Sequence, residues 1–62
     1  MGYRIKDLRE EKKMSQEDLS KESGVSRTII SGLESGAIKE TSTKTLKKIA
    51  RALGKKVSDI FF

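Results

Sequence analysis

The sequence predicts an all-α protein, a compact bundle of four to five short helices that forms one domain over residues 1–62. Three observations lead to this prediction. Apolar residues recur at spacings of three and four, as they do in amphipathic helices. A serine precedes each of three such segments and a glycine follows each, where helix caps are expected. No alternating strand pattern of useful length is present.

The first expected helix runs from Tyr3 to Lys13. Ile5 and Leu8 are three residues apart and therefore share one face, while the charged residues around them can remain in solvent. Because this apolar stripe is narrow, we expect the helix to depend on packing against its neighbours.

The second expected helix has a well-marked start. Ser15 can act as N-cap, and Asp18, three residues later, can complete a capping box. Met14 and Leu19 occupy the positions of a hydrophobic staple. Gly24 can adopt a positive φ, so this helix should end there after about two turns.

The third expected helix repeats the same start. Ser26 is its N-cap, and Val25 and Ile30 form its staple. Leu33 follows Ile30 at i+3 and continues the buried face. The helix should therefore cover about residues 27–34, and a glycine soon after should end it.

The remainder of the chain is expected to form a loop, a long helix and one last turn. Residues 37–41 show no period and are expected to be a surface loop. Ser42 can cap a fourth helix, which has the strongest amphipathic pattern and which Gly54 should end. Val57 and Ser58 repeat the staple-and-cap start for a final turn. The expected buried positions of the fourth helix are Leu46, Ile49, Ala50 and Leu53.

The composition narrows the class of function. The chain has 14 Lys and Arg against nine Asp and Glu, which gives a formal net charge of +5. Such a charge attracts polyanions, although it also serves solubility. There is no Cys, no His and no recognisable catalytic motif, so we expect no enzyme activity, no metal and no cofactor. No apolar run reaches the roughly 18 residues of a membrane span, so we expect no membrane partner and a cytoplasmic, nucleoid-associated location.

Residues of about 16–35 combine two short helices with a tight turn at Gly24, which is a helix-turn-helix. This motif sets its second helix at a steep angle, so that the helix can enter the DNA major groove. Ser20 is small where the two helices must approach each other. The chain resembles the Cro and repressor family, also called the xenobiotic-response-element type of regulator. The resemblance rests on RIKDLREEKKMSQEDLSKESGVSRTIISGLESG, TLKKIARALG and VSDIFF, and so covers nearly the whole chain. It implies a helical bundle that binds operator DNA, usually as a dimer.

The resemblance also implies which residues meet DNA. Arg27, Thr28 and Ser31 would face base edges, and Arg27 offers a fork for guanine O6 and N7. Ile29 either contacts a thymine methyl group beside them or packs at the edge of the core. The expected phosphate contacts are Gln16, Ser26, Arg9, Lys44 and Lys39.

Three of these phosphate contacts have alternatives. Arg9 and Glu34 match a family pair that bridges the first and third helices and helps to orient an arginine toward phosphate. The alternative is two solvated charges that contribute about 0–1 kcal/mol. Lys44 belongs to a lysine-rich helix face that could simply be its wet side, and the loop around Lys39 is less basic than in several relatives.

The sequence departs from the family at two positions. Gly32 stands where relatives often carry a long polar side chain that reads a base, so base reading should rest on fewer residues. Its missing side chain could also permit a close backbone approach. Ser23 stands where the family is often apolar, so looser packing is expected beneath the turn.

The last three residues, Ile60, Phe61 and Phe62, are more apolar than one short turn can easily hide. They either close the core over the fourth helix or contribute to a homodimer contact. The resemblance favours a homodimer, which would present two recognition helices about 34–36 Å apart and predicts an inverted-repeat operator.

The leading hypothesis is a transcriptional regulator, most simply a repressor, that binds double-stranded DNA. An activator is an alternative, in which Glu17, Asp18 and Glu22 contact RNA polymerase, although capping and solubility also explain these carboxylates. A different class is a protein-interaction module, such as an antitoxin or adaptor, that grips its partner through the terminal phenylalanines.

Overall fold

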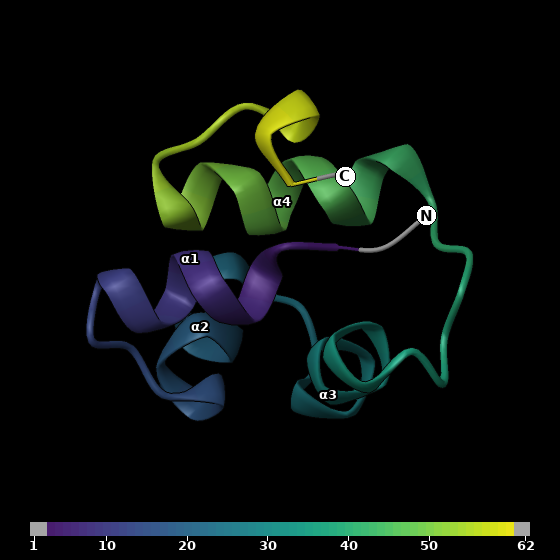
Figure 1. Ribbon diagram of the computed structural model, residues 1–62, viewed down its shortest axis with the longest axis horizontal. Coiled ribbons are helices and arrows are strands. Elements are labelled where there is room, and N and C mark those ends of the chain that lie inside the picture. The colour runs from purple at the N-terminus through teal and green to yellow at the C-terminus, as the bar shows by residue number, and fades with distance from the viewer. Residues whose placement is uncertain (1–2, 61–62) are drawn as a thin grey trace.

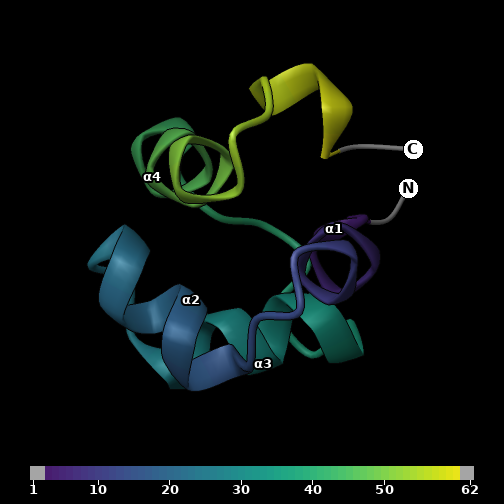
Figure 2. The ribbon, with the colours of Figure 1, turned by 90° about the vertical axis from the view of Figure 1, so that its left-hand side faces the viewer.

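The computed structural model describes residues 3–60, which form four α-helices and a 3-10 turn. α4 lies on one side of the molecule and α3 on the opposite side, with α1 and α2 between them (Figure 1, Figure 2). The all-α prediction is confirmed for this part of the chain. The elements are α1 (Ile5–Glu11), α2 (Gln16–Ser23), α3 (Arg27–Ser35), α4 (Thr43–Leu53) and η1 (Val57–Asp59).

The helix starts are set by local side-chain caps, as the sequence predicts. Ser15, Ser26 and Ser42 each accept a hydrogen bond from the backbone N–H three residues later, at 3.0, 3.3 and 3.1 Å. The capping box at Ser15 is complete, because Asp18 Oδ2 accepts the Ser15 N–H at 3.0 Å. The hydrogen bonds of Asp18 with the backbone and the side chain of Ser15 lower the pKa of Asp18.

One hydrophobic cluster holds all the elements together. It takes side chains from α1, α2, α3 and α4 and from the residue after η1, and it includes every position predicted to be buried in α3 and α4 except Leu46, which is itself buried. Burying an aliphatic side chain of this size contributes about 1.5–3 kcal/mol. No helix in residues 3–60 is long and apolar enough to cross a membrane. The fully buried side chains are Ile5, Leu19, Ile30, Ile49, Leu53 and Ile60.

Ile60 closes the core, which is the first of the two alternatives for this end of the chain, and its part in a homodimer contact stays a prediction. Its side chain is 0% exposed, and its carbonyl accepts the Arg4 N–H at 2.6 Å. A side chain already buried within one chain has no further apolar area to remove from water in a dimer. Phe61 and Phe62 lie outside the described residues, and their contribution to an interface stays a prediction.

Two element boundaries differ from the prediction. α1 is shorter than residues 3–13 because the chain must turn before α2, and Lys13 takes a left-handed conformation there with φ of 56°. η1 begins at Val57, two residues earlier than a cap at Ser58 would place it, because its N-cap is Lys56. Its start is held by the Lys56 N–H, which donates to Asp59 Oδ2 at 3.0 Å. The start of η1 is thus held by a bond from a backbone N–H to the Asp59 carboxylate, where the sequence predicted a bond to the Ser58 hydroxyl.

The loop between α3 and α4, residues 37–41, is anchored at two points. Ile38 packs against the core, and its N–H donates to the Gly32 carbonyl at 3.0 Å. The Tyr3 hydroxyl donates to the Lys39 carbonyl at 3.0 Å. A Cβ on Gly32 would lie 2.5 Å from Ile38 Cδ1, so the glycine makes room for the loop. The prediction of a simple surface loop is therefore wrong for Ile38, because an aperiodic segment does not reveal which residue turns inward.

Candidate nucleic-acid interface

The turn between α2 and α3 is fixed by two serine side chains. Gly24 ends α2 with φ of 73°, a left-handed conformation that suits glycine. Ser20 Oγ donates to the Val25 carbonyl at 2.7 Å, which ties the end of the turn back to α2. Ser23 Oγ donates to the Leu19 carbonyl at 2.6 Å and accepts the Val25 N–H at 3.2 Å. The Ser23 hydroxyl thus satisfies backbone groups inside the turn, while the looser packing expected beneath it stays a prediction.

α3 is divided into a buried side and an exposed side. Ile30 is 0% exposed and Leu33 is 2% exposed, and both anchor the helix in the core. Arg27, Thr28 and Ser31 are exposed, and they project from the opposite side of the same helix. The exposed side therefore offers a guanidinium fork and two hydroxyl groups, which are the groups that hydrogen-bond to base edges.

Ile29 and Gly32 lie at the borders of this exposed side. Ile29 is partly buried and packs against the core cluster, as the core-edge alternative expects. A thymine-methyl contact through its remaining exposed surface stays a prediction. The space beside Gly32 is taken by Ile38, so this position contributes packing rather than a base-reading side chain.

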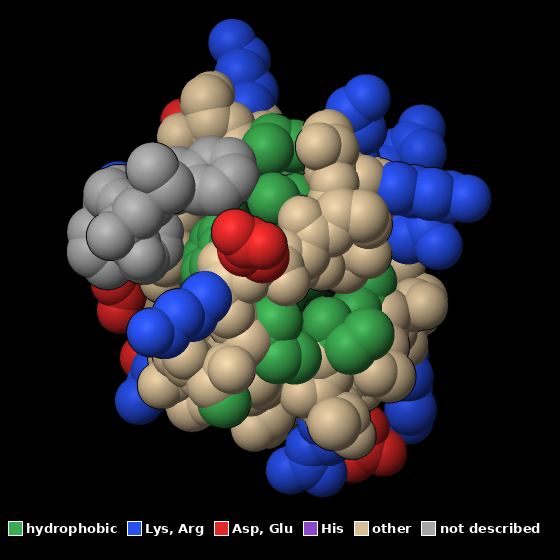
Figure 3. Space-filling model, turned by 90° about the vertical axis from the view of Figure 1, so that its right-hand side faces the viewer, with side chains coloured by type: hydrophobic (Ala, Val, Ile, Leu, Met, Phe, Trp, Pro, Cys, Tyr) green, Lys and Arg blue, Asp and Glu red, His purple; other side chains and the backbone are tan. Residues whose placement is uncertain are grey.

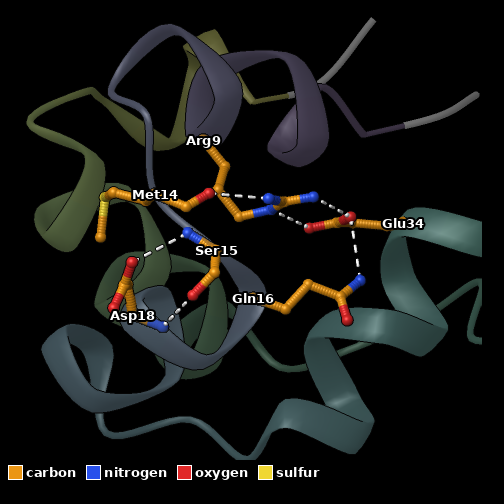
Figure 4. A network of polar contacts seen from close by, with 6 residues as sticks. All are labelled: Arg9, Met14, Ser15, Gln16, Asp18 and Glu34. Carbon is orange, nitrogen blue, oxygen red and sulfur yellow. Dashed lines mark hydrogen bonds and ion pairs between the residues drawn. The ribbon is translucent and has the colours of Figure 1, made fainter.

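A largely buried ion pair joins α1 to α3 beside the exposed side of α3. Arg9 Nε donates to Glu34 Oε2 at 2.9 Å and Arg9 Nη2 donates to Glu34 Oε1 at 3.0 Å (Figure 4). The two side chains are only 12% and 6% exposed. The hydrogen bond to Glu34 raises the pKa of Arg9. The predicted bridge is thus confirmed, and the alternative of two solvated charges is excluded.

The same network includes the carbonyl of Met14, in the turn before α2, and the side chain of Gln16, the first residue of α2. Arg9 Nη1 donates to the Met14 carbonyl at 2.7 Å, and Gln16 Nε2 donates to Glu34 Oε1 at 3.2 Å (Figure 4). Three of the five N–H groups of Arg9 are therefore in use, and one of the two on the Gln16 amide. Arg9 acts mainly by positioning α1, α2 and α3, and its own phosphate contact stays a prediction.

A shallow hollow opens next to this network, where α1, the start of α2 and α3 meet. Lys6 and Ser35 line it although the sequence analysis did not select them. Lys6 precedes Arg9 by three residues on α1, and this spacing of two cations on one face is the signal that could have identified it. The lining combines two cations, one carboxylate and polar donors. The residues are Lys6, Arg9, Gln16, Ser31, Glu34 and Ser35.

The other predicted phosphate contacts lie elsewhere. Ser26 is exposed at the start of α3, where its side chain caps the helix. Lys39 is exposed on the anchored loop. Lys44 lines a separate hollow on α4, together with other cations of that helix. The structure thus brings Arg9, Gln16 and Ser31 together and leaves Lys44 apart from them.

Two of the three carboxylates of α2 that could contact RNA polymerase interact within the chain. Asp18 completes the capping box, and Glu17 lies 3.6 Å from the ammonium of Lys21 in an exposed i,i+4 pair. Glu22 is exposed and lines a hollow with Met14. Capping explains Asp18 without a partner protein.

The family model described as helix-turn-helix matches residues 5–60 of this chain. An uncharacterized HTH-type transcriptional regulator of Archaeoglobus fulgidus is 44% identical over 61 residues, which cover 98% of this chain and 84% of the relative. A second uncharacterized HTH-type transcriptional regulator, of Methanocaldococcus jannaschii, is 41% identical over 98% of this chain and 91% of its own length. The ImmF control region 10 kDa protein of Bacillus phage phi105 is 46% identical over 81% of this chain and 54% of its own length.

Proposed function

Because the chain belongs to the Cro and repressor type of the helix-turn-helix family, we propose that it is a sequence-specific DNA-binding transcriptional regulator, most simply a repressor. In this proposal α3 enters the major groove of the operator and α2 crosses the backbone. The relatives that are named transcriptional regulators support the same role.

The observation that carries the proposal is the two-sided character of α3. Its buried side is locked into the core by Ile30 and Leu33, so the helix is a rigid support. Its exposed side presents Arg27, Thr28 and Ser31 to solvent. A good bidentate contact between an arginine and a guanine discriminates against the wrong base by about 1–3 kcal/mol. Arg27 is therefore the main candidate for base reading, with Thr28 and Ser31 beside it.

Phosphate contacts in this proposal come from the hollow beside α3 and from the helix starts. Gln16 and Ser26 stand at the starts of α2 and α3, where free backbone N–H groups and the helix dipole favour an anion. The Arg9–Glu34 pair holds Gln16 in place, because Gln16 and Arg9 bond to the same carboxylate oxygen. Contacts with phosphates do not depend on the DNA sequence, and they fix the register of the protein on the duplex.

A homodimer that binds an inverted repeat is the form we propose for operator binding. Two copies related by a two-fold axis would present α3 twice, about 34–36 Å apart, on one face of the duplex. Ile60 is buried within each chain, so Phe61 and Phe62 are the other predicted interface residues that we propose for this contact.

Selection of bound duplexes from a random library tests the proposal directly. We expect an enriched inverted repeat with half-sites about one helical turn apart. Arg27→Ala should then weaken binding to the selected duplex by about 1–3 kcal/mol for each half-site, roughly 5- to 150-fold per half-site, and relax the preference at one base pair per half-site. Lys12→Ala, a charge-matched change at an exposed residue outside α3, should leave that preference intact.

The opposite results would overturn the proposal. Binding that shows no sequence preference and does not respond to Arg27→Ala would exclude base reading by α3. Sedimentation of the full chain and of a chain without residues 61–62 tests the dimer separately. We expect the shortened chain to shift toward monomer and to bind the operator more weakly, and a profile that is monomeric for both chains, with and without duplex, would exclude the dimer.

A further inference from the structure

The outward side of α4 carries a row of cations that the α3 surface does not use. They line one hollow between α4 and η1, and no Asp or Glu is among its lining residues. Figure 3 shows Lys and Arg side chains gathered in the upper part of one face of the molecule, at the level where α4 lies in Figure 1. The five cations of this hollow, called the α4 row below, are Lys44, Lys47, Lys48, Arg51 and Lys55.

The charges of the α4 row are not neutralised by neighbours. Within residues 3–60 the ion pairs are those of Arg9 with Glu34 and of Lys21 with Glu17, and neither involves α4. None of the five side chains takes part in a hydrogen bond among the described residues, and all five are exposed. Like charges placed side by side without counter-charges repel one another, so an anion bound along the row would relieve this repulsion.

The hollow has a short apolar floor beneath its cations. Ala50 is 2% exposed and Val57 of η1 is half-buried, and both lie between the charged side chains. Lysine and arginine stems can lie along such a floor while their charged ends remain in water. The α4 row therefore lines one shallow hollow that has an apolar floor and cationic edges.

We propose that the α4 row binds the phosphate backbone of a second duplex DNA segment. Seven residues separate Lys44 from Arg51, which is about 10 Å of helix axis. One strand of DNA carries roughly three phosphates over that length. The four cations of α4 in this span are enough to pair with each of those phosphates, and Lys55 extends the row beyond the helix. The row consists of cations spaced along one helix, so we expect its contacts to be with phosphates and largely independent of DNA sequence.

The position of α4 makes this segment a second one. α4 and α3 lie on opposite sides of the molecule in both views of the ribbon (Figure 1, Figure 2). We expect a straight duplex seated on α3 to leave most of the α4 row free, since Lys44, at the start of α4, is the one member of the row that is a candidate operator contact. Binding of DNA at the α4 row does not depend on the proposed function, but the bridging of two duplexes rests on it. A protein that holds an operator on α3 can bind another duplex, or a distant part of the same DNA, on α4.

The salt dependence of binding to a non-operator duplex tests the α4 site. Removing one phosphate contact should reduce the slope of log K against log[salt] by about 0.9. The variant Lys47→Gln, Lys48→Gln, Arg51→Gln should therefore have a slope lower by about 2 to 3. Lys44 is left in place because it is also a candidate operator contact. The three side chains are exposed, so circular dichroism should show an unchanged fold.

A matched control separates the site from net charge. Arg4→Gln, Lys12→Gln, Lys13→Gln removes the same number of charges from exposed residues that flank the two ends of α1. We expect this control to keep most of the slope. Equal reductions in both variants would overturn the proposal, because the effect would then be that of overall charge.

Two further measurements need no assumption about the operator. Titration of the unaltered chain with a short non-operator duplex should shift the NMR amide signals of residues 44–55 at least as strongly as those of α3. Signals that shift in α3 alone would overturn the proposal. Vesicles of phosphatidylserine and phosphatidylcholine provide the competing source of phosphate. Vesicle binding that depends on the α4 row, combined with an unchanged DNA slope in the α4 variant, would assign the row to a membrane surface and also overturn the proposal.

Capture of a second duplex tests the bridging consequence. A tethered duplex saturated with protein should capture a labelled duplex from solution, and the α4 variant should reduce this capture at least tenfold. Failure of the library selection would overturn base reading by α3 and leave the slope and NMR results for α4 standing. Undiminished capture by the α4 variant would overturn bridging through α4.

Discussion

Arg9 and Glu34 lie 25 positions apart in the chain and meet in a two-bond ion pair at 2.9 and 3.0 Å. The pair joins the first and third helices, and its carboxylate also receives the Gln16 amide. Because both side chains are largely buried, the geometry of the pair controls how α3 sits relative to the start of α2. The spacing between the candidate base-reading and phosphate-binding groups depends on it.

Removing one partner of this pair should destabilise the protein. Glu34→Leu leaves Arg9 Nε and Nη2 without their acceptor in a largely buried place, which should cost about 1–3 kcal/mol of unfolding free energy. The double variant Arg9→Met, Glu34→Leu should recover part of that loss, because neither charge then remains unpaired. Urea unfolding followed by circular dichroism measures both. The exposed pair of Glu17 and Lys21 is the control, since Glu17→Gln should cost only about 0–1 kcal/mol. A loss of the same size in both single variants would contradict a structural role for the Arg9–Glu34 pair.

The capping box should make stability depend on acid pH. Bonds to the backbone and hydroxyl of Ser15 lower the pKa of Asp18 in the folded protein. A lowered folded pKa means that the charged carboxylate stabilises the fold above its unfolded pKa of about 3.9. This contribution is lost as the pH falls through the lowered value. The difference in unfolding free energy between the unaltered chain and Asp18→Asn should therefore be largest at pH 7 and should disappear as the pH falls into the acid range. Urea unfolding at a series of pH values checks it, and a difference independent of pH would show that the charge is not involved.

The contact between Gly32 and Ile38 should reverse the effect of a helix-favouring substitution. Gly32→Ala would gain about 1 kcal/mol of helix propensity, but its Cβ would lie 2.5 Å from Ile38 Cδ1 and 2.6 Å from Cγ1. Such overpacking typically costs about 1–3 kcal/mol, so the substitution should destabilise the chain. In an Ile38→Ala background the obstruction is gone, and Gly32→Ala should stabilise by up to about 1 kcal/mol. A thermal or urea double-mutant cycle measures the change of sign. Stabilisation in both backgrounds would mean that Ile38 moves aside at little cost.

Lys6 should act as a phosphate contact and not as a base reader. It lines the hollow with Gln16 and Ser31, beside the exposed side of α3. Lys6→Gln should weaken binding about equally for all duplexes and reduce the salt slope by about 0.9. Fluorescence anisotropy with the selected operator and with altered half-sites measures both quantities. Lys12→Gln on the same stretch of chain should leave the slope nearly unchanged. A change in base preference for Lys6→Gln would instead place its side chain in a groove.

The sequence by itself determined where α2, α3 and α4 begin and which of their positions face the core. Ser15, Ser26 and Ser42 cap the helices as expected, and apolar periodicity identified Ile30 and Leu33 as the buried side of α3. Both signals are local. A cap acts over three residues, and a helical face repeats every three or four, so neither requires knowledge of the rest of the fold.

Only the tertiary structure decided which distant side chains meet. It placed Ile38 over Gly32, brought Lys6 beside Gln16, and buried Ile60 within the single chain. These contacts depend on how the helices cross and on the path of an aperiodic loop, and no local pattern encodes either. Arg9 and Glu34 could be paired from the sequence through family resemblance, but their burial and their shared bond with Gln16 appear only when the helices are packed together.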